Sequence, residues 1–182
     1  MKNKVIIIIW MSWSWKDTLV DNILSSSDKF TKLVSTTTRD KRINEIEGKS
    51  YKFITNKEFT DGFKNWRFFQ YSKFAWNTYA YEKEELFEKI SKKNVLLISH
   101  PQSISLITFF LEQNEIEYKT VYLDISQEVG LQRMKSRGDS ETSIKWRLEE
   151  REEFVWYKKK ADIVIDSSIS KEYSLSEFLR KV

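Results

Sequence analysis

The feature that most constrains the fold is a short, continuously apolar segment near the start of the chain, followed by a basic loop and a helical stretch. Val5 to Ile9 are all apolar and β-branched, which is typical of a strand buried on both faces of a parallel sheet. Asp17 to Leu24 has the pattern of the helix that follows this strand. A strand, a loop and a helix in this order favour an α/β fold.

The same alternation of strands and helices continues along the chain. Further short apolar strands are predicted at residues 33–36, 95–98, 121–123 and 163–165. Helices are predicted at residues 82–90, 104–112, 128–135 and 140–157. The pattern therefore predicts a doubly wound α/β fold, with a parallel sheet and helices on both of its faces.

Two regions depart from this alternation. Residues 50–81 are dense in Tyr and Phe and predict short strands at 50–54, 67–74 and 77–81 with a helix at 57–64, which together form a small antiparallel insertion. The charged helix at 140–157 has few apolar positions and is expected to form a mobile flap over solvent. We expect one domain with its core at about 1–34, 82–136 and 158–182, an inserted region at about 35–81 and a lid at about 137–157.

Composition excludes several classes of function. The 182 residues include no cysteine and a single histidine, His100, which excludes disulfide scaffolds, thiolate metal sites and histidine-rich metal sites. The net charge is +4, but 31 basic and 27 acidic residues make a mixed surface with one basic run, Lys158 to Lys160. A nucleic-acid platform is therefore not expected. The apolar segment at Val5 is too short to span a bilayer, so a cytoplasmic protein without a membrane partner is expected.

The loop after the first strand contains an anomaly in composition. The chain has 4 glycines and 7 tryptophans, whereas average usage would give roughly 13 glycines. Phosphate-binding loops between a strand and a helix read G-x-x-x-x-G-K-[ST], because backbone N–H groups must surround a phosphate. Here the loop keeps the lysine and the polar residues, but tryptophan stands at the two defining glycine positions and at a third common one. The segment is Trp10, Met11, Ser12, Trp13, Ser14, Trp15, Lys16, Asp17 and Thr18.

The spacing of the tryptophans argues against a packed aromatic core. Trp10, Trp13 and Trp15 share neither a strand face nor a helix face. Trp66 follows a predicted helix where a C-terminal glycine is common, and Trp76 stands in a predicted hairpin turn. We therefore hypothesise that most or all of the seven tryptophans are glycine in the natural protein. Some genetic codes read UGA as glycine and another reads it as tryptophan. Deliberate Gly→Trp engineering and a naturally inactive loop are the alternatives.

With glycine at those positions, nearly the whole chain resembles the guanylate kinase family. The most specific stretch is STTTRDKRINEIEGKSY, residues 35–51, which is similar to the family's S-x-T-T-R-x-x-R-x-G-E-x-x-G-x-x-Y segment and departs from it at Asn44. The resemblance implies that a monophosphate is held by Ser35, Arg39, Arg42 and Tyr51. The chemistry agrees, since two guanidinium groups match a dianionic phosphate and neutral hydroxyls bind its remaining oxygens.

A second stretch, FAWNTYAY at residues 74–81, resembles the family's F-x-G-N-x-Y-G segment and implies that Tyr79 also contacts the acceptor nucleotide. Two departures concern the base. Gln70 stands where the family has a guanine-reading glutamate, and His100 stands where it has an aspartate. Gln70 can accept a hydrogen bond through its carbonyl, but it lacks the charge and the second acceptor of a carboxylate.

The third stretch, residues 137–147, resembles the family's R-G-x-D/E…I-x-x-R lid, one residue shorter. The resemblance implies that Arg137 and Arg147, with Arg133, reach the transferring phosphate as the lid closes. Lys16 would bridge the β- and γ-phosphates of ATP. Asp17 stands where the family has Ser or Thr, so the metal-binding residue stays open, with Asp17 or Thr18 as candidates for Mg²⁺.

These motifs predict Mg²⁺-dependent transfer of the ATP γ-phosphoryl group to a nucleoside monophosphate, GMP or dGMP first. Lys16, Arg39, Arg133, Arg137 and Arg147 are the predicted catalytic residues. The same chemistry on another phosphorylated acceptor, such as ribose 1,5-bisphosphate, is one alternative, because the Lys-Asp-Thr order also resembles ribose bisphosphate kinases. A third possibility, of another class, is a catalytically inactive binding module, which follows if the loop tryptophans are genuine. The sequence leaves the oligomeric state open.

Overall fold

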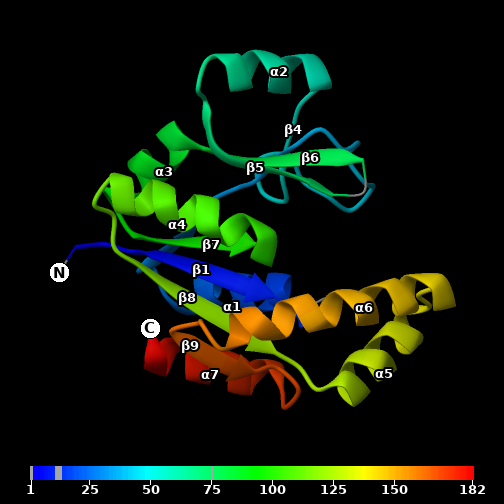
Figure 1. Cartoon of the computed structure of the whole chain (residues 1–182). Helices are drawn as coiled ribbons and strands as arrows, with labels where there is room; N and C mark the ends of the chain where they lie inside the picture. Colours follow the sequence, from blue (N-terminus) through cyan, green and yellow to red (C-terminus); the bar gives the residue numbers. More distant parts are fainter. Residues whose placement is uncertain (1, 11–13, 75) are drawn as a thin grey trace. The chain divides into compact units, whose positions relative to one another are not determined.

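The computed structural model describes residues 2–10, 14–74 and 76–182 (Figure 1). Its contacts divide the chain into two compact units, and we describe each by itself. Unit 1 comprises Met1–Val5, Thr31–Leu97 and Gln102–Tyr118. Unit 2 comprises Ile6–Phe30, Ile98–Pro101 and Lys119–Val182.

Unit 2 contains the strand and the helix that enclose the phosphate-loop motif. Strands β1 (Val5–Trp10), β8 (Tyr118–Asp124) and β9 (Ile163–Asp166) are neighbours in that order, and β8 and β9 pair in parallel. The four residues from Ile6 to Ile9 are buried, as a strand covered on both faces should be. The helices of this unit are α1 (Lys16–Ser26), α5 (Gln127–Arg137), α6 (Glu141–Lys158) and α7 (Lys171–Lys181).

Among the α6 side chains that the structure describes, few belong to the core of unit 2. Phe154 is buried, whereas Trp146, Val155 and Trp156 are exposed. Lys158, at its last turn, forms an ion pair with Asp124 at the end of β8, with Nζ and Oδ2 2.6 Å apart. None of the described helices combines the length and the apolar character that crossing a bilayer requires.

Unit 1 contains a four-stranded sheet with the order β4-β3-β6-β5. Strands β5 (Phe68–Phe74) and β6 (Asn77–Glu82) form an antiparallel hairpin, and β3 (Thr36–Thr37) pairs antiparallel with β6. Strand β4 (Lys52–Phe53) pairs parallel with β3. Helix α2 (Asn56–Lys64) covers this sheet (Figure 1). The ring of Phe59 on α2 stacks on that of Phe68 on β5, with centroids 5.2 Å apart.

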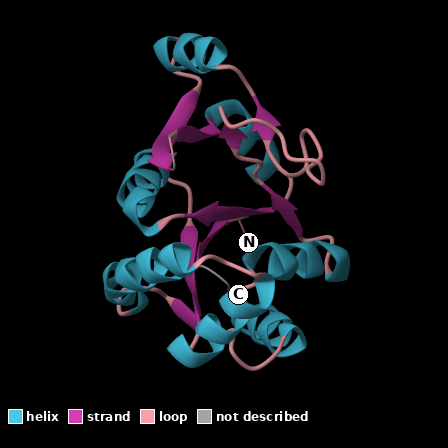
Figure 2. Cartoon of the chain, turned by 90° about the vertical axis from the view of Figure 1, so that its right-hand side faces the viewer, coloured by secondary structure: helices cyan, strands magenta, loops and turns pink. Residues whose placement is uncertain are grey.

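The rest of unit 1 includes two neighbouring strands of the five-stranded sheet. Strand β2 (Phe30–Lys32) neighbours β7 (Asn94–Ser99), and Leu33 continues this contact by donating its backbone N–H to the carbonyl of Leu96 at 2.9 Å. The remaining elements are α3 (Lys83–Ile90), the 3-10 turn η1 (Pro101–Ser103) and α4 (Ile104–Gln113). Figure 2 shows the helices and strands of the chain by type.

The predicted α/β fold class is confirmed, and the predicted strands and helices are found within a few residues of their predicted bounds, with three exceptions. The strand predicted at 33–36 is wrong: β2 ends at Lys32 and β3 begins at Thr36. Leu33 and Val34 connect β2, a strand of one sheet, to β3, a strand of the other. Both residues are buried, and their apolar side chains gave the pattern of a strand. The insertion is not purely antiparallel, because β3 and β4 run parallel. The C-terminal helix α7, which begins after its N-cap Ser170, was not predicted.

Candidate functional site

The loop after β1 leads directly into helix α1. Met11, Ser12 and Trp13 lie outside the described residues, so the predictions that fall on Ser12 and Trp13 have no structural counterpart here. Trp15 is the N-cap of α1. Ser14 is 2% exposed, and its hydroxyl has no hydrogen-bond partner among the described residues. Lys16, in the first turn, places Nζ 2.7 Å from Oδ2 of the exposed Asp17.

The Trp15 backbone has the conformation that glycine favours. Its φ of 56° and ψ of 29° lie in the left-handed region, which a bulky residue rarely enters. Among the described residues other than glycine, positive φ occurs at Trp15, Trp66, Trp76 and Glu115. Three of these four are tryptophans that the sequence had singled out as standing in glycine positions. Backbone geometry therefore supports the hypothesis at each of these three positions.

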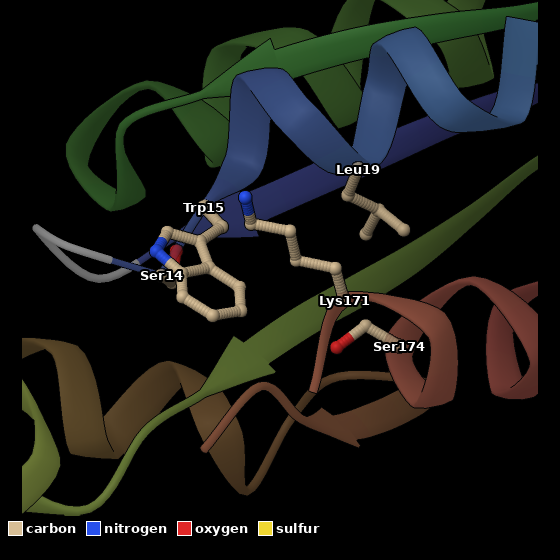
Figure 3. Close-up of a pocket in the computed structure, with 5 residues that line it drawn as sticks. All are labelled: Ser14, Trp15, Leu19, Lys171 and Ser174. Atoms are coloured by element: carbon tan, nitrogen blue, oxygen red, sulfur yellow. The ribbon is translucent and has the colours of Figure 1, made fainter. Parts of the chain in front are cut away.

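The indole of Trp15 lies between two cations. Cζ of Arg133 is 3.7 Å from the centroid of the ring, and Nζ of Lys171 is 4.8 Å from it. Figure 3 shows the Lys171 side chain extending toward Trp15 across a small pocket, which is also lined by Ser14, Leu19 and Ser174. Glycine at position 15 would leave these two cations facing the space beside the first turn of α1.

The three arginines predicted to reach the transferring phosphate are each held by a hydrogen bond within unit 2. Arg133 donates from Nη2 to the backbone carbonyl of Ser167 at 3.0 Å, and its burial lowers the pKa of the guanidinium group. Arg137 donates from Nε to Oδ1 of Asp139 at 2.8 Å, and this hydrogen bond lowers the pKa of the Asp139 carboxyl. Arg147 donates from Nε to the hydroxyl of Ser143 at 3.2 Å.

The chain connects α5 to α6 through a short, well-capped turn. Gly138 follows α5 with a φ of 82°, a conformation that glycine adopts without strain. Ser140 then caps α6 by accepting a hydrogen bond from the backbone N–H of Ser143. These two caps fix the hairpin in which Arg137 stands at the end of one helix and Arg147 on the second turn of the next.

In unit 1 the predicted monophosphate residues converge in what we call the acceptor cluster: Arg39, Tyr51 and Tyr79. Cζ of Arg39 lies 5.4 Å from the centroid of the Tyr51 ring, and the rings of Tyr51 and Tyr79 meet edge to face at 5.9 Å. Nη2 of Arg39 is 2.6 Å from Oε1 of Glu45. Hydrogen bonding to Glu45, partly opposed by burial, raises the pKa of Arg39. A permanently charged guanidinium between two phenols is suited to hold an anion.

Ser35 and Arg42 are less directly involved in this cluster. The Ser35 hydroxyl lies 3.4 Å from the backbone carbonyl of Ala80. Arg42 is exposed and joins through its backbone, which donates to Oε2 of Glu45 at 2.9 Å. Glu45 therefore binds both arginines of the motif, the side chain of one and the backbone N–H of the other. Glu45 was not predicted as a site residue, although it lies within the motif at residues 35–51.

The base-side prediction, Gln70, is buried. Its Nε2 donates to Oγ of Ser103 at 2.8 Å. Ser103 was not selected from the sequence, because nothing in the sequence places η1 beside β5. Lys171 was not selected from the sequence either, because the helix on which it stands, α7, was not predicted. His100 packs edge-on against Phe154, with ring centroids 5.1 Å apart.

A buried carboxylate supports the sheet on which the acceptor cluster stands. Oε1 of Glu82 accepts hydrogen bonds from Thr36 and Arg67, both at 2.8 Å, and Oε2 lies 3.2 Å from Nζ of Lys52. Burial acts to raise the pKa of Glu82, but hydrogen bonds from Arg67 and Thr36 and the charge of Lys52 outweigh it, so the pKa is lowered. Strands β3, β4 and β6 are thus joined through one ionised side chain.

Metal binding depends on few residues. The described residues contain no group of three His, Cys, Asp or Glu side chains that could hold a metal ion. Mg²⁺ bound mainly by nucleotide phosphates usually takes one or two protein ligands and keeps several waters. Asp17 is exposed in the first turn of α1, beside Thr18. Its carboxylate and the Thr18 hydroxyl fit that role.

Comparison with known proteins covers almost the whole chain. A family model described as guanylate kinase matches residues 2–181. A guanylate kinase from Prochlorococcus marinus is 32% identical over 166 residues, which cover 90% of this chain and 88% of the relative. One from the Wolbachia of Brugia malayi is 28% identical over 161 residues, covering 88% and 83%. The crystal structure of guanylate kinase from Anaplasma phagocytophilum superposes with a TM-score of 0.74 at 20% identity, covering 99% of this chain and 85% of that one.

Proposed function

Because the chain belongs to the guanylate kinase family of nucleoside monophosphate kinases, we propose that it transfers the γ-phosphoryl group of ATP to GMP or dGMP. The observation that carries this assignment is the acceptor cluster, in which Arg39 and Tyr51 of the most specific motif lie together and Tyr79 of the second motif meets Tyr51. A purine monophosphate offers that cluster a dianion to bind and a base to recognise.

The acceptor cluster would bind the monophosphate by exchanging partners. Arg39 is bound to Glu45 in the structure, at 2.6 Å. A dianionic phosphate carries more charge than a carboxylate, so the guanidinium would turn from Glu45 to the ligand, with Arg42 as the second fork. Ser35, Tyr51 and Tyr79 would supply neutral hydroxyls to the remaining phosphate oxygens. Gln70 would face the base.

Unit 2 would bind the phosphate donor. Lys16 would bridge the β- and γ-phosphates, while backbone N–H groups at the start of α1 surround them. An oxygen of the acceptor phosphate attacks the γ-phosphorus, the bond from that phosphorus to the β,γ-bridging oxygen breaks, and ADP leaves. Arg133, Arg137 and Arg147 would balance the charge on the transferring group, and lid closure would exclude water. No covalent enzyme intermediate is needed.

Mg²⁺ bound with ATP would supply neutralisation of the phosphate oxygens. Asp17, or Thr18 beside it, would hold the ion directly or through water. For this, Asp17 would exchange the ammonium of Lys16, now 2.7 Å away, for the metal. Lys16 would be released toward the phosphates by the same exchange.

We propose that positions 10, 13 and 15 are glycine in the active protein. The left-handed backbone at Trp15, and at Trp66 and Trp76 elsewhere, supports this. The indole at position 15 also lies against Arg133 and Lys171, two cations that would attract phosphate. Sequencing the codons at these three positions is a direct check: UGA is expected at each, and ordinary UGG codons would contradict the misreading hypothesis.

We propose that three parts of the chain have separate functions. Residues 35–81 would bind the acceptor and residues 137–157 would form the lid, around a core at 1–34, 82–136 and 158–182. Both appendages would move relative to the core during turnover, because the donor and the acceptor must enter before water is excluded.

A coupled assay of ADP release tests the proposed function. The chain with glycine at positions 10, 13 and 15 is assayed with ATP and Mg²⁺ against GMP, dGMP, AMP, UMP and ribose 1,5-bisphosphate. We expect the highest kcat/KM with GMP or dGMP. Turnover confined to the sugar phosphate would overturn the choice of acceptor. Binding of GMP without turnover in this glycine-containing chain would favour an inactive binding module.

A further inference from the structure

We infer that Lys52 is a positioning residue for the acceptor phosphate, because its side chain anchors the short strand that follows Tyr51; this inference rests on the proposed function. Lys52 is the first residue of β4. Its Nζ lies 2.7 Å from Oε2 of Glu85 on α3 and 3.2 Å from Oε2 of Glu82 on β6. Both carboxylates, which we call the carboxylate pair, are largely buried, with 11% of each side chain exposed. Through Tyr51, Lys52 would set how tightly a nucleoside monophosphate binds.

Strand β4 is held by a short backbone ladder. It consists of two residues and pairs in parallel with β3. The backbone N–H of Lys52 donates to the carbonyl of Ser35, and that of Ile54 donates to the carbonyl of Thr37, both at 3.0 Å. Residues 46–49, which lead toward the strand, are exposed. The ion pairs of Lys52 therefore add a side-chain attachment where the backbone ladder is short.

Tyr51 and Lys52 point to opposite faces of the extended segment, because successive side chains alternate along a strand. Tyr51 and Phe53 face Arg39, whose Cζ lies 5.4 Å and 5.8 Å from the centroids of their rings. Lys52, between them in the chain, reaches the carboxylate pair instead. Holding Lys52 on one face therefore limits the movement of the Tyr51 ring on the other, although Lys52 itself faces away from the acceptor cluster.

Lys52 shares the carboxylate pair with two other cations. Nη2 of Arg67 lies 2.8 Å from Oε1 of Glu82, and Nζ of Lys89 lies 3.5 Å from Oε1 of Glu85. Burial acts to lower the pKa of Lys52, but hydrogen bonding to Glu85 and the charges of both carboxylates outweigh it, so the pKa is raised and the ammonium stays charged at neutral pH. When Lys52 is replaced, each carboxylate keeps a cation, and the variant is expected to fold.

The segment that contains Ser35 is attached to the carboxylate pair without Lys52. One carboxylate accepts a hydrogen bond from the backbone N–H of Val34 at 3.3 Å, and the other accepts one from the hydroxyl of Thr36 at 2.8 Å. These contacts lie on either side of Ser35. Loss of the Lys52 ammonium should therefore release Tyr51 and leave Ser35 in place.

Isothermal titration of the full chain with GMP tests this inference without requiring turnover. K52M and K52Q both remove the ammonium, so that either can be used if the other unfolds, and K52R keeps the charge. Y51F removes the phenol hydroxyl, and Y51F/K52M combines the two changes. K57M is the matched control, because Lys57 is exposed in the first turn of α2 and its replacement removes the same charge. Thermal melts establish that each variant is folded.

K52M and K52Q should weaken GMP binding at least about fivefold, as expected when one hydrogen bond to the phosphate is lost. K52R and K57M should stay within about twofold of the parent, since the first keeps the anchor and the second does not touch it. Y51F, which loses the hydroxyl outright, should weaken binding at least as much as K52M. In the Y51F background K52M should then cost less than about twofold, because two changes that act through one contact are not additive.

Unchanged GMP affinity in folded K52M or K52Q would overturn the role of Lys52, and so would a loss of equal size in K57M, which would reflect net charge alone. A K52M effect of the same size with and without the Tyr51 hydroxyl, or GMP binding unaffected by Y51F, would overturn the route through Tyr51. Failure of the parent chain to bind any nucleoside monophosphate would contradict the proposed function itself. The titration of the parent chain therefore separates failure of the proposed function from failure of this inference.

Discussion

A tryptophan in the left-handed region is strained because its Cβ approaches the following carbonyl group, and a residue in a sparsely populated region costs about 1–3 kcal/mol. Trp66 and Trp76 are in this region, with φ of 55° and 68°. They are 79% and 104% exposed, so their indoles recover little of that cost through burial. At the residue scale, the backbone conformation at both positions suits glycine better than tryptophan.

Replacing these two residues by glycine should therefore stabilise the protein. We expect W66G and W76G each to raise the free energy of unfolding by about 1 kcal/mol, since relief of strain exceeds the added entropy of the unfolded chain. W146G is the control: Trp146 lies inside helix α6, where glycine should lower stability by about 1 kcal/mol. Urea unfolding measures all three. Destabilisation by both W66G and W76G would show that these indoles are accommodated without strain.

At the scale of elements, the acceptor cluster depends on short strands that one carboxylate joins. Strands β3 and β4 have two residues each, too few for the ladder alone to hold them. Glu82 on β6 supplies the missing contacts through Thr36 and Lys52, and Arg67 completes the group. The charge of Glu82 is thus part of the structure that positions Arg39 and Tyr51.

This arrangement predicts a dependence of stability on pH. The folded-state pKa of Glu82 is lowered from its ordinary value of 4.5, so its contribution is present above pH 4.5 and is lost as pH falls through the folded pKa. E82Q should be less stable than the parent at pH 7, and the difference should shrink as pH falls below about 4.5. Thermal melts between pH 3 and 7 measure this, with E84Q as control, because Glu84 is exposed on α3. A difference independent of pH would contradict the role of the Glu82 charge.

Elements with a clear period could be predicted from the sequence, and contacts between distant elements could not. The buried strand at Val5 and helix α2, whose Thr55 and Glu58 form a capping box, have local signals. The segment at 33–36 was misread because burial alone does not reveal that one strand ends and another begins. The bond from Gln70 to Ser103 spans 33 residues, and no local pattern indicates it.

At the scale of the whole molecule, the proposed reaction would use residues of both units. Lys16 and the lid arginines belong to unit 2, whereas the acceptor cluster belongs to unit 1. Both sets of residues are predicted from motif spacing, because each motif is continuous in sequence. Arg137 is bound to Asp139, so in the proposed closure of the lid it would exchange this partner for phosphate.

This exchange gives a kinetic prediction. R137A should lower kcat at least about a hundredfold, because a cation that stabilises charge in the transition state is removed, while the KM for GMP should change by less than about threefold. R180A is the control, since Arg180 pairs with Glu177 on the exposed face of α7. Steady-state assays of the glycine-containing chain measure both. A KM effect without a kcat effect would place Arg137 in acceptor binding.

The central claim is that a guanylate kinase fold here carries a working phosphate loop once glycine stands at positions 10, 13 and 15. The most direct measurement compares ATP- and Mg²⁺-dependent phosphorylation of GMP by the printed chain and by its W10G/W13G/W15G variant. We predict turnover by the variant and at least a thousandfold less by the printed chain, because indoles exclude the phosphates from the loop. Equal activity of the two chains, or a folded variant without activity on any nucleoside monophosphate, would contradict the account.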